Sequence, residues 1–285
     1  METATANTPD RTHPQPDRLT RDRQLVGFVA RHGVVTIEHV MAALGVGRAS
    51  AYRRVAHCID RGLLERLELL RREPSLLRAT RRGLRFAGLG LPLAIVSPAS
   101  VDHSLRCAST AIELGREAGA DRVLSERELI LAERVEGRPI ASAKVGELPG
   151  GRPRLHRPDL VVLPSGHPLV RLHQERIGPS SSAPDGNQAR RTGEDGGVVV
   201  VEVELTPKSP QRLREIVRGW RRASWVDEVR YHCEPGPTRR AVERAVSKLH
   251  AGDRIVITEA LPARSEQASK SEPSRREQSA GRCSR

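Results

Sequence analysis

Residues 198–205 read VVVVEVEL, the strongest β-strand signal in this chain of 285 residues. It starts with four valines in a row, which is typical of a strand that is buried on both faces of a sheet. Downstream of it, helical and extended patterns alternate: helices are expected from Ser209 and from Thr238, and strands over 229–233 and 254–257. This order favours right-handed crossovers above a partly parallel sheet. The sequence therefore predicts an α/β domain.

The residues before this strand predict the other half of the α/β domain, which we expect to span 101–262. A helix over 101–118 precedes a strand signal within 123–131, and a further strand is expected over 158–163. The Gly- and Pro-rich stretch 138–153 is expected to be a loop. The strand over 158–163 would pair with the VVVVEVEL strand through a widened hairpin connection.

Segments poor in apolar residues divide the chain. Residues 1–19, an insertion over about 176–197 and the tail 263–285 are dominated by polar residues, so we expect them to be disordered. A Pro-broken apolar linker, placed at 92–100, separates the α/β domain from a first domain over 20–91. The expected fold class is α/β, or α+β for the whole chain, with two domains.

Positive charge is concentrated in the first domain. The chain has 48 Lys and Arg against 35 Asp and Glu, a formal net charge of +13, and residues 20–91 hold 14 basic and 6 acidic side chains. Such a basic cluster attracts polyanions. A membrane partner is not expected, because no apolar run approaches the ~18–20 residues that cross a bilayer. The four cysteines form no CxxC pair, which is typical of reduced thiols in the cytoplasm.

The first domain reads as three short helices, a hairpin and a fourth helix. Residues that cap helices stand at the expected boundaries. These residues are Thr20, Gly33, Thr36, Gly45, Gly47, Gly62 and Thr80. The third helix, 48–61, has an apolar stripe on one side and a polar stripe on the other. The polar stripe consists of Ser50, Arg53, Arg54, His57 and Arg61.

Two short helices joined by a tight Gly-containing connection, the second with an arginine stripe, are what insertion into the DNA major groove requires. Strands over 64–72 and 76–79 would form a wing. Residues 20–91 therefore resemble the winged helix-turn-helix domains of bacterial regulators, which implies binding to double-stranded DNA. The expected DNA contacts are Arg48, Ser50, Arg53, Arg54, His57, Arg61, Arg71 and Arg72. The alternative is a helical domain whose arginines form only a solvated face.

Acidic residues gather in the α/β domain. Glu202 and Glu204 are two apart on one strand, so both side chains project from the same face. Asp159 begins the strand expected to pair with it, and Lys208 follows Glu204 by four residues. Converging carboxylates can bind Mg²⁺, and a nearby lysine can activate water. The alternative is that these acids form ion pairs with arginines such as Arg157.

Pro158-Asp159, followed by a strand with Glu202-Val203-Glu204, resembles the PD-(D/E)xK nuclease superfamily. That superfamily places an Asp and a Glu-x-Lys on neighbouring strands around a metal. The resemblance implies a Mg²⁺-dependent nuclease in which Asp159, Glu202 and Glu204 bind the metal and act in catalysis together with Lys208. The sequence departs from the pattern, because Glu204 occupies the position of the lysine. Lys208 is either a relocated lysine or a residue that only begins the next helix.

The arrangement as a whole resembles the actinobacterial replication-relaxation family. The residues that carry this resemblance are Asp102-His103, Ser125-Glu126-Arg127-Glu128, His156-Arg157-Pro158-Asp159-Leu160 and 201–209 (VEVELTPKS). It covers about residues 20–260 without the insertion. It implies a winged-helix DNA-binding protein of a plasmid or mobile element, acting in plasmid replication and DNA relaxation, with other replication or transfer proteins as partners.

Three functions therefore compete. The first is a plasmid DNA-binding protein that needs no cofactor, the second is a Mg²⁺-dependent endonuclease or nickase, and the third is a winged-helix transcriptional regulator. A relaxase with a tyrosine nucleophile is not expected, because the chain has no His-x-His cluster. ATP-driven chemistry is not expected either, since no GxxxxGK[ST] loop is present. The oligomeric state stays open.

Overall fold

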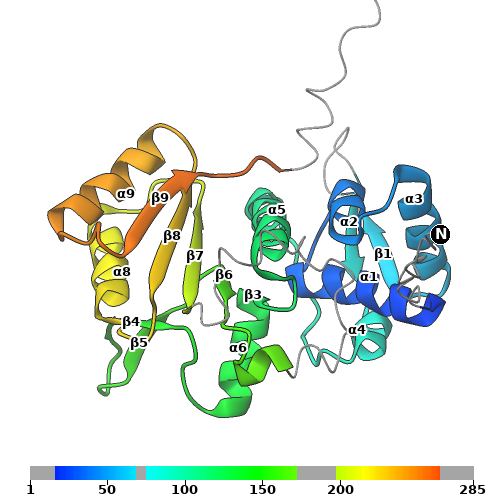
Figure 1. The fold of residues 1–285 in the computed structure, drawn as a ribbon, viewed down its shortest axis with the longest axis horizontal. Helices are drawn as coiled ribbons and strands as arrows, with labels where there is room; N and C mark the ends of the chain where they lie inside the picture. The colour runs from blue at the N-terminus through cyan, green and yellow to red at the C-terminus, as the bar shows by residue number, and fades with distance from the viewer. Residues whose placement is uncertain (1–16, 69–74, 172–196, 264–285) are drawn as a thin grey trace, which may run out of the picture.

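The computed structural model describes residues 17–68, 75–171 and 197–263. The helical N-terminal part lies at one end of the molecule and a five-stranded mixed sheet at the other, with helix α5 (Pro98–Ala118) between them (Figure 1). The expected wing tip with Arg71 and Arg72, the insertion over 176–197 and nearly all of both expected disordered ends lie outside the described residues. The helices and the mixed sheet confirm the predicted α/β fold class.

Local capping chemistry sets the helices of the N-terminal part. The elements are α1 (Arg18–His32), α2 (Ile37–Leu44), α3 (Arg48–Asp60), β1 (Leu64–Leu67), β2 (Leu76–Ala79) and α4 (Arg81–Ala87). Thr36 and Thr80 cap α2 and α4 as predicted. The start of α1 was predicted wrongly: Asp17, not Thr20, is the N-cap, and its Oδ1 accepts a hydrogen bond from the Thr20 backbone N–H at 2.6 Å. A carboxylate so placed satisfies an otherwise unpaired helix N–H.

The second part is built on a sheet of order β3-β6-β7-β8-β9. Its remaining elements are β3 (Val123–Ser125), α6 (Glu126–Glu136), β4 (Ala143–Glu147), β5 (Pro153–His156), β6 (Leu160–Val162), β7 (Val199–Glu204), α8 (Pro210–Arg222), β8 (Glu228–Cys233), α9 (Pro237–Lys248) and β9 (Ile255–Glu259). β6 is antiparallel to β3 and β7, whereas β7, β8 and β9 are parallel. Helices α8 and α9 cover one face of the sheet and α5 the other (Figure 1).

Two segments differ from the sequence predictions. The strand signal within 123–131 ends at Ser125, where α6 begins in a capping box formed by Ser125 and Glu128. The predicted loop 138–153 instead contributes a strand to the β4–β5 hairpin. This hairpin packs on α8 at Gly219, where an added Cβ would lie 3.1 Å from the Lys144 carbonyl oxygen. The close approach gives the hairpin apolar contacts that its sequence alone does not indicate.

The Ser125→Ala variant is expected to lose about 1 kcal/mol of unfolding free energy, because the hydroxyl and the Glu128 carboxylate cap α6 reciprocally. Urea denaturation monitored by circular dichroism measures the change. Ser224→Ala, an exposed serine replaced in the same way, is the control and should leave the midpoint unchanged. Equal stability of both variants would show that the capping box contributes nothing.

The two parts are joined by buried polar contacts. The Arg31 Nε on α1 lies 2.9 Å from the Glu128 carboxylate on α6, and the Arg127 Nε donates to the Ala30 carbonyl oxygen at 3.1 Å. The ring of His39, fully buried, lies 3.0 Å from the Leu105 carbonyl oxygen of α5. The expected linker is also shorter than predicted, because α5 begins at Pro98. Helices α1 and α2 are thereby joined to α6 and α5 of the second part.

Candidate functional site

Helix α3 has one buried and one exposed face. Ala51, Val55 and Cys58 are each 0% exposed and belong to the N-terminal core. Tyr52 and Arg53 are exposed on the other side. The connection from α2 turns at Gly45, whose φ of 61° lies in the left-handed region that glycine adopts without strain. The predicted two-faced helix is therefore present.

The cations of the predicted DNA-binding stripe fall into two groups. His57 Nε2 lies 3.4 Å and Arg61 Nη1 2.9 Å from Asp22 Oδ2, so these two side chains are held against α1 by a hydrogen bond and an ion pair to the same carboxylate. Arg48 lies 3.9 Å from Glu38, a weak contact at an exposed side chain. Arg53 and Arg54 have no hydrogen-bond or ion-pair partner among the described residues. Ser50 is partly exposed near the start of the helix, and Arg71 and Arg72 fall outside the described ranges.

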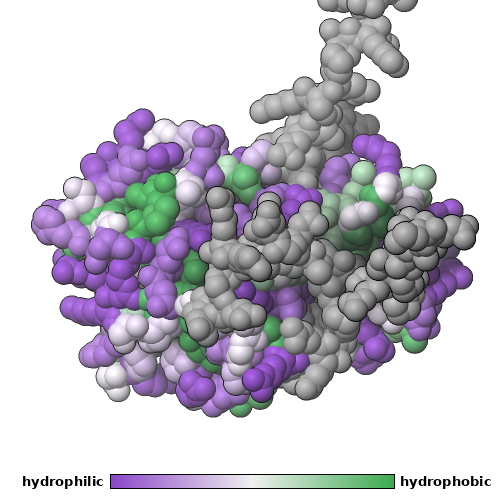
Figure 2. Space-filling model, in the orientation of Figure 1, coloured by the Kyte–Doolittle hydropathy of each residue, from purple (hydrophilic) through white to green (hydrophobic). Residues whose placement is uncertain are grey.

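The visible surface is polar. Hydrophilic residues cover most of the described surface in Figure 2, and apolar residues form small patches. No helix in the described part of the chain is long and apolar enough to cross a membrane.

The predicted acidic residues lie on neighbouring strands. Asp159 precedes β6, and β6 pairs with β7 so that Leu160 faces Val201. The Asp159 Oδ2 accepts a hydrogen bond from the Val203 backbone N–H at 2.7 Å, which ties its carboxylate to β7. Glu202 and Glu204 project from the same side of β7, as expected, and are only 2% and 3% exposed.

Each glutamate already has a protein partner. Glu202 Oε1 accepts a hydrogen bond from Trp220 Nε1 at 2.9 Å and lies 2.7 Å from His156 Nε2. Glu204 forms an ion pair with Lys208. Burial raises the pKa of the Glu204 carboxyl, while Lys208 acts in the opposite direction. The acids therefore pair with a histidine, a tryptophan and a lysine, whereas Arg157 pairs with Glu133.

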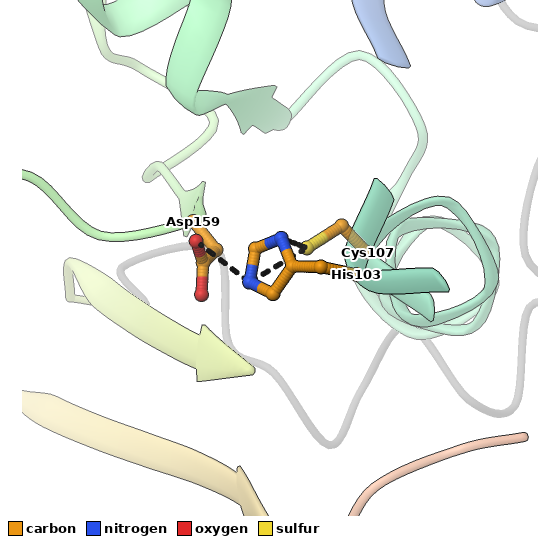
Figure 3. Close-up of side chains that lie close together, drawn as sticks. All are labelled: His103, Cys107 and Asp159. Carbon is orange, nitrogen blue, oxygen red and sulfur yellow. Dashed lines mark hydrogen bonds and ion pairs between the residues drawn. The ribbon is translucent and has the colours of Figure 1, made fainter. Parts of the chain in front are cut away.

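Asp159 belongs to a different group of side chains, on the α5 side (Figure 3). Its Oδ1 lies 3.4 Å from His103 Nε2, and the Cys107 Sγ lies 3.7 Å from His103 Nδ1. The hydrogen bond to Asp159 raises the pKa of the His103 imidazole, although burial lowers it. Burial, together with Asp159, Glu126 and Glu202, raises the pKa of the Cys107 thiol well above its usual range.

A Mg²⁺ ion bound jointly by Asp159, Glu202 and Glu204 does not fit this arrangement well. Mg²⁺ requires oxygen ligands that are free to coordinate in an octahedral geometry. In the structure Glu202 accepts from Trp220, and Glu204 is neutralised by Lys208. Both contacts would have to break before the three carboxylates could share an ion.

Asp159→Asn is expected to lower the pKa of His103 relative to wild type, because the amide removes the negative charge that favours the imidazolium. In wild type the folded-state pKa of His103 lies above 6.5. Its protonation therefore stabilises the fold fully below about pH 6.5, and this contribution is lost as the pH rises through the raised pKa. NMR titration of the His103 Hε1 signal in chelator-containing buffer tests this.

The exposed Asp102 on the same helix provides the control. Asp102→Asn should leave the His103 titration nearly unchanged, because Asp159 lies 3.4 Å from His103 Nε2, whereas the exposed Asp102 pairs with Arg106. A His103 pKa that is equal in wild type and Asp159→Asn would contradict the contact.

Sequence reasoning missed His156 and Trp220, which contact Glu202 from β5 and α8. His156 immediately precedes the motif Arg157-Pro158-Asp159, so its position in the sequence was a signal. For Trp220 the sequence indicated only a buried position on the apolar face of its helix. Comparison of the chain with protein-family models, with curated proteins and with solved structures found no match.

Proposed function

We propose that this protein binds double-stranded DNA through the exposed face of α3, as a protein of a plasmid or mobile element. The observation that carries the proposal is that the side chains of Arg53 and Arg54 are accessible and form no contacts with other polar side chains of the described residues. Arg53 is exposed on the side of α3 opposite its buried stripe, Arg54 is partly exposed beside that stripe, and neither has a hydrogen-bond or ion-pair partner among the described residues. Arginines without protein partners are available to phosphates and base edges.

The surroundings of α3 support this use. Helices α2 and α3 are joined by residues 45–47, a connection as short as in helix-turn-helix units. The antiparallel β1–β2 pair follows α3 and carries the exposed Arg66. A helix that enters the major groove is accompanied by such flanking contacts to the backbone.

The expected biological setting rests on the resemblance to the replication-relaxation family. On that basis the protein acts in plasmid replication and DNA relaxation, together with other replication or transfer proteins. Duplex binding itself needs no cofactor, since the proposed contacts are side-chain donors to an anionic backbone.

The test is the binding of the full chain to a fluorescent duplex at several salt concentrations. We expect the logarithm of the association constant to fall linearly with the logarithm of the salt concentration, with a slope of about −0.9 for each phosphate neutralised. A supercoiled plasmid should compete with the labelled duplex. Absence of binding at low salt, or binding that does not depend on salt, would contradict the proposal.

A second candidate function is a metal-dependent nuclease. It is favoured by one observation: Asp159, directly before β6, accepts a hydrogen bond from β7, the strand that carries Glu202. The supercoiled plasmid incubated with protein and Mg²⁺ or Mn²⁺ tests it, by the appearance of nicked circles. Absence of nicking would contradict a nuclease function, and nicking by Asp159→Asn as fast as by wild type would show that Asp159 takes no part in the cleavage.

A further inference from the structure

Three side chains of types that bind metals meet between α5 and β6 (Figure 3). His103 and Cys107 are four residues apart, so they stand on the same face of α5. Asp159 enters the group from the start of β6. One ligand atom from each of the three lies within 4.8 Å of the others, and no other such group of three occurs among the described residues.

The separations match those of ligand atoms around zinc. In a tetrahedral site with bonds of about 2.0–2.3 Å, neighbouring ligand atoms stand about 3.3–3.7 Å apart. His103 Nε2 lies 3.4 Å from Asp159 Oδ1 and 3.9 Å from Cys107 Sγ. The Sγ lies nearly equally far from both ring nitrogens, at 3.7 and 3.9 Å, so the Cys107 and His103 side chains must turn toward Asp159 to place one ion between the three ligand atoms.

The donor types also favour zinc over magnesium. Thiolate and imidazole are ligands of Zn²⁺ and similar transition metals, whereas Mg²⁺ takes oxygen ligands almost exclusively. An Asp159 carboxylate that binds zinc in this group is no longer fully available as a ligand for Mg²⁺ beside Glu202 and Glu204. In contrast to Glu202 and Glu204, His103 is not enclosed by protein, because 42% of its side chain is exposed. An ion can therefore reach this group from solvent.

In the absence of an ion, the ring of His103 forms hydrogen bonds at the nitrogen where an ion would bind. His103 Nε2 lies 3.1 Å from the Val203 carbonyl oxygen, so the N–H donates both to it and to Asp159. A metal ion at Nε2 would take the place of this proton. The nearby carboxylates of Glu126 and Glu202 add negative charge around the group. They disfavour a free thiolate, which argues against a nucleophilic cysteine, but they attract a divalent cation.

We propose that His103, Cys107 and Asp159 bind one Zn²⁺ ion per chain. Three protein ligands leave a fourth coordination position for water, as in zinc sites that act on substrates rather than only stabilise a fold. This inference goes beyond duplex binding by α3 and does not depend on it. The Arg53→Ala, Arg54→Ala protein should bind zinc as wild type does.

Cobalt provides the direct test, because Co²⁺ occupies zinc sites and reports its ligands. The full chain, treated with a chelator and then titrated with Co²⁺, should show a thiolate-to-cobalt charge-transfer band that saturates at one ion and disappears when Zn²⁺ is added. Cys107→Ser should abolish the band and weaken zinc binding by about 100-fold or more, since loss of even an outer-shell partner costs 10–100-fold. Cys283→Ser is the matched control and should change neither.

A second measurement covers the case in which Cys107→Ser does not fold. Zn²⁺ should protect Cys107 of the wild-type protein from alkylation, as detected by mass spectrometry of the Cys107 peptide. His103→Gln should remove that protection. The proposal fails if wild type takes up no Co²⁺ or Zn²⁺, or if Co²⁺ binds without a charge-transfer band. The latter result would favour an oxygen-only site at the acidic residues.

Discussion

The Arg53→Ala, Arg54→Ala protein is expected to bind duplex DNA about 100-fold more weakly than wild type at 0.1 M salt. Each side chain has no partner in the described structure, so its loss removes a DNA contact without disturbing the fold. We expect about 1.4 kcal/mol, or tenfold in affinity, for each arginine, within the range of single contacts to DNA. The salt slope should become shallower by about one unit for each arginine that contacts a phosphate.

Helix α9 supplies a matched control. Arg240 and Arg244 are exposed, stand four residues apart and have no side-chain partner among the described residues. Their replacement by alanine removes the same charge at the other end of the molecule (Figure 1). We expect less than about a twofold loss, since distant charges are screened beyond a Debye length. If the α9 variant loses affinity and the α3 variant does not, α3 is not the contact surface.

Local signals predicted most of the helices and the central strands. Thr36, Gly45 and Thr80 act within one turn of the residues they cap, so their effect can be read from neighbouring letters. The VVVVEVEL strand is buried on both sides by α5 and α8, which is why it starts with four valines in a row. The Ser125-Glu126-Arg127-Glu128 sequence carried a capping-box signal that outweighs the strand pattern around it.

The rest depended on contacts between distant residues. The β4–β5 hairpin has few apolar residues, and its strands are stabilised by packing on Gly219, more than 60 positions away. Similarly, nothing local to His103 indicates that its ring faces Asp159, because the two meet only after β6 pairs with β7. The acidic residues were predicted as a single cluster, but in the structure they have different partners: Glu202 contacts His156 and Trp220, Glu204 pairs with Lys208, and Asp159 contacts His103 on α5.

The Glu202→Ala protein is expected to lose about 3–5 kcal/mol of unfolding free energy, the largest effect on stability predicted here. Glu202 is 2% exposed and accepts from Trp220 Nε1, while His156 Nε2 lies 2.7 Å away. Truncation leaves the buried indole N–H without an acceptor and the His156 ring without its hydrogen-bond partner. It also opens a cavity beside the Trp220 ring. Urea denaturation measures the loss.

Glu202→Gln separates the structural role of this carboxylate from a role in metal binding. The amide oxygen can still accept from Trp220, so this variant should keep most of the stability that Glu202→Ala loses. A carboxylate retained only to bind an ion is destabilising in the ion-free fold, and its removal would leave stability unchanged or raised. If the Glu202→Ala protein is as stable as wild type, the result supports the role of Glu202 as a metal ligand that the nuclease resemblance implies. A large loss would instead identify Glu202 as the acceptor that fixes α8 on the sheet.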